Sequence, residues 1–405
     1  MTRRSPLLLM ICAVAVGVGM AGCGDSNNST GGASTGPIKV MTLGTFDAPV
    51  IGWNVANVPA AIEARAKTIN ANGGINGRKV EVIECNSAAD PNKAAICGRK
   101  AVSEKVAAIV RTNIAPTDEA GLYAILNKAK IPVIGANVST SVGGSSPVAV
   151  PLANEEAFAY VPNALSAAGA KKISVVGSAE TKSPEGTAGA IAAIKAAGAQ
   201  PGQIVYVPGN TVDYTPYAAK AIANGADGVA VVAFPQTNPS IVRALRAQGF
   251  KGKIGAATLF MQDKSIKALG DLANGMIFVG QYAPITADLP AMKMFRQDIA
   301  KYAQKYPRDE FSLGAWLAMW TFERVAEKLN TVDNKSVLKA MSNLTDFDQG
   351  GITPPLTTTK PGKSVNNPKI TRAFNPFLTY SVVNDGKYSA LTKGKLFHDP
   401  VGEEK

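Results

Sequence analysis

Residues of the types that most often perform catalysis are scarce in this chain of 405 residues. His398 is the only histidine, and it lies near the C-terminus. A Ser/His/Asp or Cys/His arrangement and a histidine-rich metal site are therefore not expected. The phosphate-binding pattern GxxxxGK followed by Ser or Thr is absent, and no GxGxxG follows the first predicted strand of either half of the chain. We expect no enzyme activity, no cofactor and no metal, although a glycosidase-like pair of carboxylates needs no fixed spacing and stays open.

The N-terminus is predicted to be a secretory signal over residues 1–22. Two arginines precede the apolar stretch Leu7–Met20, which is shorter than the roughly 20 residues that a spanning helix needs. Met20-Ala21-Gly22-Cys23 resembles a bacterial lipobox, in which Cys23 is lipidated; an ordinary signal peptide with an incidental cysteine is the alternative. Residues 23–37 are polar and rich in Gly and Ser, which is typical of a flexible tether. No later segment is long and apolar enough to span a bilayer, so the lipid would be the only membrane anchor.

Cys85 and Cys97 are the two cysteines that remain once the signal segment and Cys23 are set aside. Outside the cytoplasm an isolated pair is most simply a disulfide. A metal or redox pair is the alternative, but the two residues lack CxxC spacing and a nearby histidine. A disulfide would pin the helix that carries Cys97 to the edge of a sheet, and closing so short a loop is worth ~3 kcal/mol in the chain-entropy model.

The net charge of the chain is +12, and removal of residues 1–22, with two arginines and no acids, leaves +10. Such a charge suits nucleic acid. However, the basic residues are scattered, no basic run is interleaved with aromatics, and the chain is predicted to be exported. We therefore expect no nucleic-acid partner, and a basic surface near anionic lipid explains the charge.

The stretch Ala61–Glu84 predicts a helix, a turn and a strand. The polar residues between the apolar positions of the helix are Glu63, Arg65 and Lys67. Asn72, Gly73 and Gly74 end the helix, because glycine accepts the left-handed backbone that a helix C-terminus needs. Asn76-Gly77 indicates a tight turn, and Lys79–Glu84 alternates apolar and polar residues as a strand does.

Strands and helices are expected to alternate in two series. In the first, strands are expected at 38–43, 79–84, 106–110 and 131–134, with helices near 61–71, 90–104 and 117–130. In the second, strands are expected at 172–176, 204–207, 228–232, 253–256 and 276–279, with helices near 154–168, 184–197, 214–224, 237–248 and 263–269. Helices near 288–305, 311–329 and 335–343 follow, and then a hairpin of strands 377–383 and 387–395. The strands are mostly apolar, which predicts an α/β fold with parallel sheets covered on both faces, and the aromatic face of the 311–329 helix is predicted to be core.

The string INANGGINGRKV, Ile69–Val80, strongly resembles part of the leucine/isoleucine/valine-binding protein family. With the doubled α/β series, the resemblance extends over nearly the whole mature chain. It implies the type I periplasmic-binding-protein fold, which has two Rossmann-like lobes joined by three hinge crossings. Crossings are expected near 149–153, 281–285 and 350–372. Lobe 1 would be 38–150 plus 285–350, and lobe 2 would be 151–284 plus 351–405.

The resemblance also implies that a ligand binds between the lobes, at the loops that follow the strands. The ligand-binding residues it implies are Phe46, Trp53, Thr112, Asn113, Asn137 and Ser139 in lobe 1, and Glu180, Ser183, Gln236 and Thr258 in lobe 2. Trp53 would form an apolar wall of the pocket, with a core tryptophan as the alternative. Thr112, Asn113, Asn137 and Ser139 would hold the charged end of the ligand.

The chain departs from the amino-acid binders of the family at three positions. Ser183 and Gln236 stand where many members have a tyrosine, and Thr258 stands near the acid that pairs with the ligand ammonium. Burying an ammonium without a carboxylate partner costs roughly several kcal/mol. Either another acid (Asp47, Glu180 or Asp263) takes that role, or the ligand is not an α-amino acid.

The function implied by the resemblance is that of a monomeric solute-binding lipoprotein on the outer face of the cytoplasmic membrane. It would capture a branched-chain amino acid-like molecule, or a related amide or aromatic acid, by closing its two lobes, and would serve an ABC permease. A ligand sensor on the same fold is the first alternative, and an extracytoplasmic hydrolase is the second.

Overall fold

The computed structural model of the chain describes residues 36–49, 53–114, 118–137, 140–154, 156–179, 182, 184–261, 263–364 and 369–400. These residues belong to the second of two compact units into which the chain divides, Thr35–Lys405. The predicted signal segment, Cys23 and nearly all of the predicted tether lie outside the described residues. What the sequence indicates about them remains a prediction.

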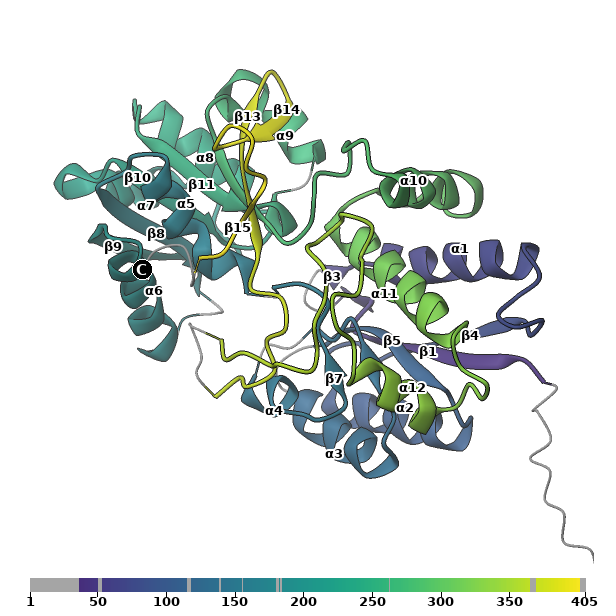
Figure 1. Ribbon diagram of the computed structural model, residues 1–405. Coiled ribbons are helices and arrows are strands. Elements are labelled where there is room, and N and C mark those ends of the chain that lie inside the picture. The colour runs from purple at the N-terminus through teal and green to yellow at the C-terminus, as the bar shows by residue number, and fades with distance from the viewer. Residues whose placement is uncertain are drawn as a thin grey trace, which may run out of the picture. The chain divides into compact units, whose positions relative to one another are not determined.

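Five parallel strands form the first sheet, in the order β4-β1-β5-β6-β7. Their bounds are Ile38–Gly44 (β1), Val80–Asn86 (β4), Ala108–Asn113 (β5), Val133–Ile134 (β6) and Ala149–Val150 (β7). Helices α1 (Asn57–Ala71), α10 (Pro290–Tyr302) and α11 (Glu310–Ala326) cover one face, and α2 (Pro91–Ser103) and α3 (Glu119–Ala129) cover the other (Figure 1). The short elements β2 (Asp47–Ala48), β3 (Trp53–Asn54), α4 (Ser141–Gly144) and α12 (Asn334–Met341) complete this part, which we call the first lobe. Burial on both faces explains why β1 and β5 read as apolar runs without alternation.

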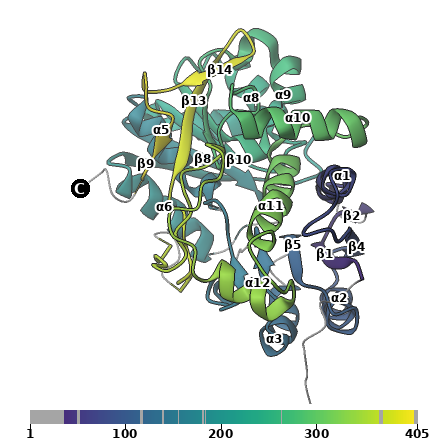
Figure 2. The same cartoon turned by 45° about the vertical axis from the view of Figure 1, so that its right-hand side comes forward.

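The second sheet has eight strands, in the order β14-β13-β12-β11-β10-β8-β9, with β15 paired to β13. The parallel strands are β8 (Lys172–Ser178), β9 (Gln200–Val207), β10 (Gly228–Val232), β11 (Lys253–Ala257) and β12 (Ile277–Gly280). Antiparallel strands β13 (Leu378–Asn384), β14 (Lys387–Ala390) and β15 (Phe397–His398) extend it, as Figure 2 shows in yellow. The helices are α5 (Val161–Ala167) and α6 (Pro184–Ala196) on one face, and α7 (Thr215–Ile222), α8 (Asn238–Ala247) and α9 (Asp263–Leu269) on the other. We call this part the second lobe.

These two sheets confirm the predicted α/β class and the two alternating series. Two details differ from the expectation where the first series passes into the second. The first crossing, expected near 149–153, begins with β7, which pairs with β6 in the first sheet. The helix expected near 154–168 starts as a 3-10 turn, Ala157–Tyr160 (η3), and becomes α-helical only at Val161, with Pro162 in its first turn, a position that proline favours.

Three segments carry the chain between the lobes, after β7, after β12 and before β13, and hydrogen bonds join them to one another. The Ala283 N–H donates to the carbonyl of Ile352 at 2.8 Å. The amides of Gln349 and Asn375 both donate to the carbonyl of Leu152, at 3.1 and 3.3 Å. The three crossings therefore lie side by side.

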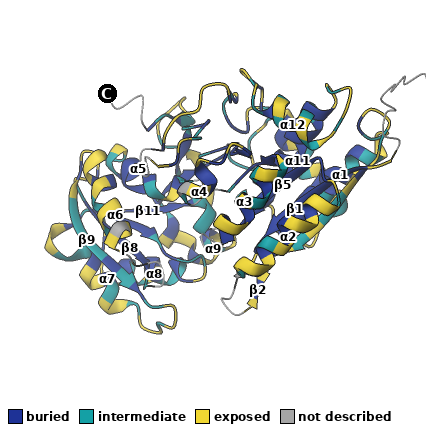
Figure 3. Ribbon diagram, turned by 90° about the horizontal axis from the view of Figure 1, so that it is seen from below, coloured by how far each residue is buried: buried dark blue, intermediate teal, exposed yellow. Residues whose placement is uncertain are grey.

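Helix α11 is buried around its whole circumference: 15 of its 17 residues are buried, including Trp316 and Trp320, whose rings stack at 5.5 Å. Figure 3, coloured by burial, contrasts such internal elements with the edge strand β9, which is teal and yellow. Asp309 caps the helix, because its side chain accepts from the Ser312 N–H while the Ser312 hydroxyl accepts from the Asp309 N–H. The prediction that the aromatic face is core is confirmed.

Arg65 corrects the polar face predicted for α1, because it is buried rather than solvated. Its guanidinium donates to Glu323 of α11 at 2.7 and 2.9 Å and to Asp298 of α10 at 3.2 Å. Trp316 Nε1 also donates to Asp298, at 2.7 Å. Burial raises the pKa of Glu323, and the positive charge of Arg65 opposes that rise.

We expect Arg65→Met to lower the free energy of unfolding at pH 7 by about 3–5 kcal/mol, because it leaves two buried carboxylates without their cation. A carboxyl whose pKa is higher in the folded than in the unfolded protein favours folding as the pH falls, so the loss should shrink toward acid pH. Urea denaturation at several pH values measures both effects. Lys67→Met is the control, since Lys67 is exposed and, among the residues that the structure describes, pairs only with Glu63 at 3.7 Å; equal losses in the two variants would contradict the prediction.

Candidate functional site

The predicted disulfide is present between Cys85 and Cys97, with Cα atoms 5.8 Å apart. Cys85 lies in β4, the edge strand of the first sheet, and Cys97 lies in α2, so the bridge fastens this helix to the sheet edge as expected. Asp90 caps α2 through the N–H groups of Asn92 and Lys93, and Pro91 occupies its first position.

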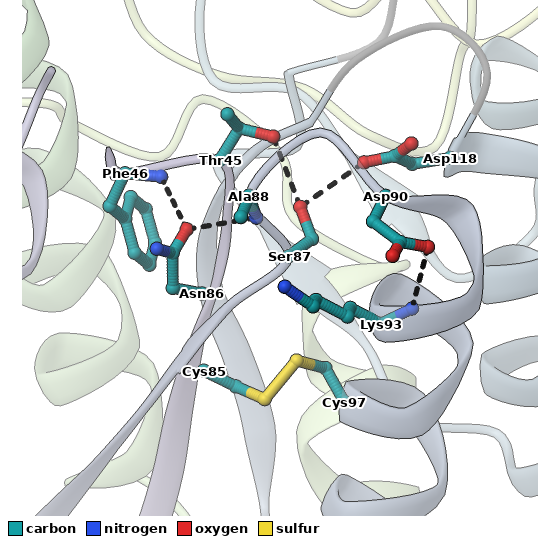
Figure 4. Close-up of a disulfide and its surroundings, with 10 residues drawn as sticks. All are labelled: Thr45, Phe46, Cys85, Asn86, Ser87, Ala88, Asp90, Lys93, Cys97 and Asp118. Carbon is teal, nitrogen blue, oxygen red and sulfur yellow. Dashed lines mark hydrogen bonds between the residues drawn. A yellow bond between two sulfur atoms is a disulfide. The ribbon is translucent and has the colours of Figure 1, made fainter. Parts of the chain in front are cut away.

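The loop after β1 is held directly beyond this bridge (Figure 4). The Asn86 side-chain oxygen accepts from the N–H groups of Phe46 and Ala88, both at 3.0 Å, and its amide nitrogen donates to the Asp47 carbonyl at 2.9 Å. Ser87 connects the hydroxyl of Thr45 to the carboxylate of Asp118. The disulfide therefore anchors the strand end on which the first predicted ligand loop depends.

Thr112, Asn113 and Asn137 come together at the carboxyl edge of the first sheet. Thr112 Oγ1 accepts from the Asn137 N–H at 3.0 Å, and the Asn113 amide donates to the Thr45 carbonyl at 3.2 Å. Gly44 allows this approach, because a Cβ there would lie 2.5 Å from the Asn113 carbonyl oxygen. These side chains join the loops after β1, β5 and β6 into one surface.

Strand β5 continues further than predicted, to Asn113, and a bulge breaks its pairing with β1 at Arg111. Arg111 has a positive φ of 59° and is 2% exposed. Its guanidinium donates to the Gly135 carbonyl at 3.4 Å, at the base of the loop that carries Asn137. The strand was expected to end at residue 110, so Arg111 was placed in the loop after it; bulges often turn a side chain toward a functional site.

The other predicted ligand residues fall into different environments. Phe46 is 1% exposed and packs in the core between the first sheet and α11. Gln236 is exposed, and Thr258 donates its hydroxyl hydrogen to the Val279 carbonyl at 3.2 Å. Trp53 lies in β3, whose backbone is described while the side chain is not. Ser139, Glu180 and Ser183 lie outside the described residues.

A small hollow, open to solvent, lies where the carboxyl ends of β11 and β12 meet the second crossing and the N-terminus of α11. Its lining residues are Thr258, Met261, Tyr282–Thr286, Arg308–Glu310, Thr379, Ser381 and Tyr388. Thr258 is a predicted ligand residue; the charged residues of the lining, Arg308, Asp309 and Glu310, were not predicted. They precede a helix whose start was predicted at residue 311. The sequence pattern does not indicate that residue 310 lies near the end of β11 in the folded chain.

The 3-10 turn Thr258–Phe260 (η6) is where the lobes touch beside this hollow. Leu259 packs against the core cluster of the first lobe, while the Phe260 ring lies 6.0 Å from the ring of Phe158 in the second lobe. Phe158 is 44% exposed, which leaves an accessible aromatic surface at this edge. Neither phenylalanine was predicted as a site residue.

Of the three acids considered as partners for a ligand ammonium, Glu180 lies outside the described residues. Asp47 accepts a hydrogen bond from the Asn54 amide at 3.3 Å on an exposed turn, and the position of the Asp263 side chain is not described. Within the described ranges, no three His, Cys, Asp or Glu side chains are grouped as a metal site would require. In the same residues, no helix combines the length and the apolar character needed to cross a membrane. The arrangement is suited to holding a small molecule with hydrogen bonds and apolar contacts.

Comparison with known proteins gives one family match, to the periplasmic binding protein family over residues 37–372. The Leucine-specific-binding protein of Salmonella typhimurium is 34% identical over 79 residues, which is 20% of this chain and 21% of that protein. The chain thus matches about a fifth of the length of this curated relative.

Solved structures resemble the chain over most of its length. A substrate-binding periplasmic protein from Ralstonia solanacearum has a TM-score of 0.69 at 18% identity, covering 86% of this chain and 98% of that one. A branched-chain amino acid transporter substrate-binding protein from Streptococcus pneumoniae, in complex with isoleucine, has a TM-score of 0.65 at 16% identity, covering 87% and 98%. A fatty acid ABC transporter substrate-binding protein from Thermomonospora curvata has a TM-score of 0.69 at 17% identity, covering 91% and 95%. These similarities confirm the predicted type I fold.

We expect the double variant Cys85→Ala/Cys97→Ala to lose about 3 kcal/mol of stability, because its unfolded chain is no longer constrained by the short closed loop. Denaturation of the wild type with and without reductant should show a similar difference. The double variant, which has no bridge to break, should unfold at the same denaturant concentration in both conditions. Wild-type protein that is insensitive to reductant would contradict the prediction.

Proposed function

The chain belongs to the periplasmic binding protein family, and from this premise we propose that it captures a small solute between its lobes for an ABC importer. The family is one of binding proteins, in agreement with the expectation that the chain is not an enzyme. The observation that carries the proposal is the match over residues 37–372, which includes the first sheet and the parallel strands β8 to β12 of the second. The solute would be a branched-chain amino acid-like molecule or a related amide or aromatic acid.

The proposed binding surface is formed by the loops at the carboxyl ends of the strands of both lobes. In parallel sheets these ends are where ligands bind, since they carry loops rather than buried backbone. In the first lobe, the joined loops of Thr112, Asn113 and Asn137 support this assignment, with Trp53 and Ser139 as further proposed contacts. In the second lobe, Thr258 faces the hollow, and Glu180, Ser183 and Gln236 are proposed to complete the surface.

Closure is proposed to be a rotation of the two lobes about the three crossings. The lobes would be 38–150 with 285–350 and 151–284 with 351–405. The hydrogen bonds between the crossings at Leu152, Ala283 and Ile352 support a hinge that bends as one unit, because none of the crossings can move far without the others.

A second candidate function, presentation of the ligand state to a sensor in the membrane, uses the same fold and the same closure. The motif around Cys23 serves either function, since both need the domain at the outer face of the membrane. In import, the substrate-binding protein supplies the solute to the importer. This function therefore predicts that cells lacking this protein lose uptake of the solute.

A thermal-shift screen of amino acids, amides and aromatic acids tests solute capture. A ligand that binds only the folded protein stabilises it by about 2.7 kcal/mol at a concentration 100 times its dissociation constant. This stabilisation raises the melting temperature. We expect at least one of these compounds to do so. No stabilisation by any of them would contradict the proposal.

Lipid attachment predicts that the wild-type protein is recovered with membranes and released by detergent. We expect Cys23→Ala to remove this anchorage and leave the binding domain in the soluble fraction, because no other lipid site is proposed. Fractionation with metabolic labelling by a radioactive fatty acid checks both results. A labelled Cys23→Ala protein would contradict lipidation at this residue.

A further inference from the structure

Helix α3 begins with two acidic residues, Asp118 at its N-cap and Glu119 as its first residue, and both are fully buried. We propose that Glu119 is a positioning residue for ligand binding: its carboxylate fixes the loop after β6, which carries the proposed contacts Asn137 and Ser139. The inference rests on the proposed solute capture. It adds to that function a residue that acts through this loop rather than through contact with the solute.

Both carboxylate oxygens of Glu119 bind the segment that follows Ser139 in the sequence. Glu119 Oε1 accepts from the Thr140 N–H at 3.3 Å, and Oε2 accepts from the Thr140 hydroxyl at 2.5 Å and from the Gly143 N–H at 3.0 Å. A carboxylate has only acceptors, so it suits a set of three donors. Hydrogen bonds to a charged acceptor are also stronger than those between neutral groups. Glu119 therefore holds this segment more firmly than a neutral side chain would.

The segment depends on such contacts because α4 is only four residues long. A single turn of helix is not stable alone, so its position is determined by what packs against it. A Cβ at Gly143 would lie 2.6 Å from Glu119 Oε2, which shows that the carboxylate packs closely against the backbone of α4. At the end of α4, the Gly144 carbonyl accepts from the N–H groups of Thr371 and Arg372, at 3.1 and 3.0 Å. Helix α4 is therefore held by α3 and by the third crossing.

The loop between β6 and α4 is anchored at two points. The Asn137 N–H donates to Thr112 Oγ1 at 3.0 Å, which ties the first part of the loop to β5. The contacts of Thr140 with Glu119 tie its last part to α3. Along the chain, the two anchors are separated only by residues 138–139. A loop that is already ordered loses little freedom when a solute binds, so the second anchor contributes to the affinity from outside the binding surface.

Asp118 extends this support to other loops of the first lobe. Its carboxylate accepts from the Ser87 hydroxyl at 3.1 Å, and that hydroxyl lies 3.0 Å from the hydroxyl of Thr45 (Figure 4). Ser87 follows β4, and Thr45 follows β1. Through two adjacent residues, the start of α3 is thus connected to the loops after β1, β4 and β6, and the relative positions of these loops depend on it.

A purely structural role for Glu119 makes a different prediction. A carboxylate in the first turn of a helix interacts favourably with the helix dipole, whether or not the loop after β6 binds a solute. Loss of that interaction, or of buried hydrogen bonds, lowers the melting temperature but leaves the affinity of the folded protein unchanged. Affinity and the order of the loop therefore distinguish the two roles, and the melting temperature does not.

The test removes the anchor from either side. Glu119→Gln replaces one acceptor oxygen by an amide group that donates, so it no longer matches three donors. Thr140→Val removes the hydroxyl from the loop and leaves α3 unchanged, and Thr140→Ser keeps the hydroxyl. Glu323→Gln is the control, because it also alters a buried carboxylate of the first lobe, and this carboxylate binds Arg65 in the core.

Each variant is measured in two ways. Hydrogen exchange followed by mass spectrometry reports the opening of residues 136–146 with no solute present. Calorimetric titration with L-leucine, benzamide and 3-phenylpropanoate reports the affinity for an amino acid, an amide and an aromatic acid. We expect Glu119→Gln and Thr140→Val to exchange faster in this segment. They should also bind any of these compounds about tenfold more weakly than wild type does, because binding must then order the loop.

Thr140→Ser should resemble wild type in both measurements, and Glu323→Gln should melt at a lower temperature with unchanged affinity. Wild-type exchange and affinity in Thr140→Val would overturn the inference, even where Glu119→Gln does not fold. Equal loss of affinity in Glu119→Gln and Glu323→Gln would overturn it in favour of a general loss of stability. Faster exchange with unchanged affinity would overturn it while leaving solute capture intact. If none of the three compounds binds wild type, the inference fails, and the wider thermal-shift screen decides separately whether solute capture fails with it.

Discussion

A helix that is buried on every side must find partners inside the protein for its charged side chains and for the backbone groups at its ends. Helix α11 is such a helix, and the partners that it needs determine much of the packing around it. Its N-terminus is closed by Asp309 and Ser312, and Asn57 of α1 reaches the same carboxylate. Glu323, close to its C-terminal end, is compensated by Arg65. Both contacts connect α11 to α1, so the packing of the first lobe and the start of α11 are fixed together.

The same helix connects the core to the candidate site. Its first residue lines the hollow, and Leu259 of the second lobe packs against the core cluster to which α11 belongs. Gly314, one turn into the helix, lies so close to Tyr282 that a Cβ there would be 2.6 Å from the tyrosine hydroxyl. The position of Glu310 relative to the second crossing is therefore determined by core packing.

Elements that depend on local signals were predictable from the sequence. The Asp90-Pro91 helix start, the Asn76-Gly77 turn and the Asn384-Asp385-Gly386 hairpin are each specified by neighbouring residues, and the structure contains all three. The disulfide was predictable because only two cysteines remained to pair. The buried position of Arg65 was not predictable, since its partners are more than 230 residues away along the chain. It also stands among the polar positions of the helix, where a solvated residue is expected. The bulge at Arg111 has no local signal at all.

The candidate site also combines residues that local sequence signals locate with residues that only the folded chain brings together. Strand ends can be located from a sequence, so Thr112, Asn137 and Thr258 could be placed at them. Glu310 could not be placed in the hollow, because β13, α11 and η6 approach one another only in the folded chain. The sequence alone suggested a pocket of amides and hydroxyls lacking an acid for an ammonium. Helix α11 brings the Glu310 carboxylate into the lining beside Thr258, and no pattern along the chain connects these two residues.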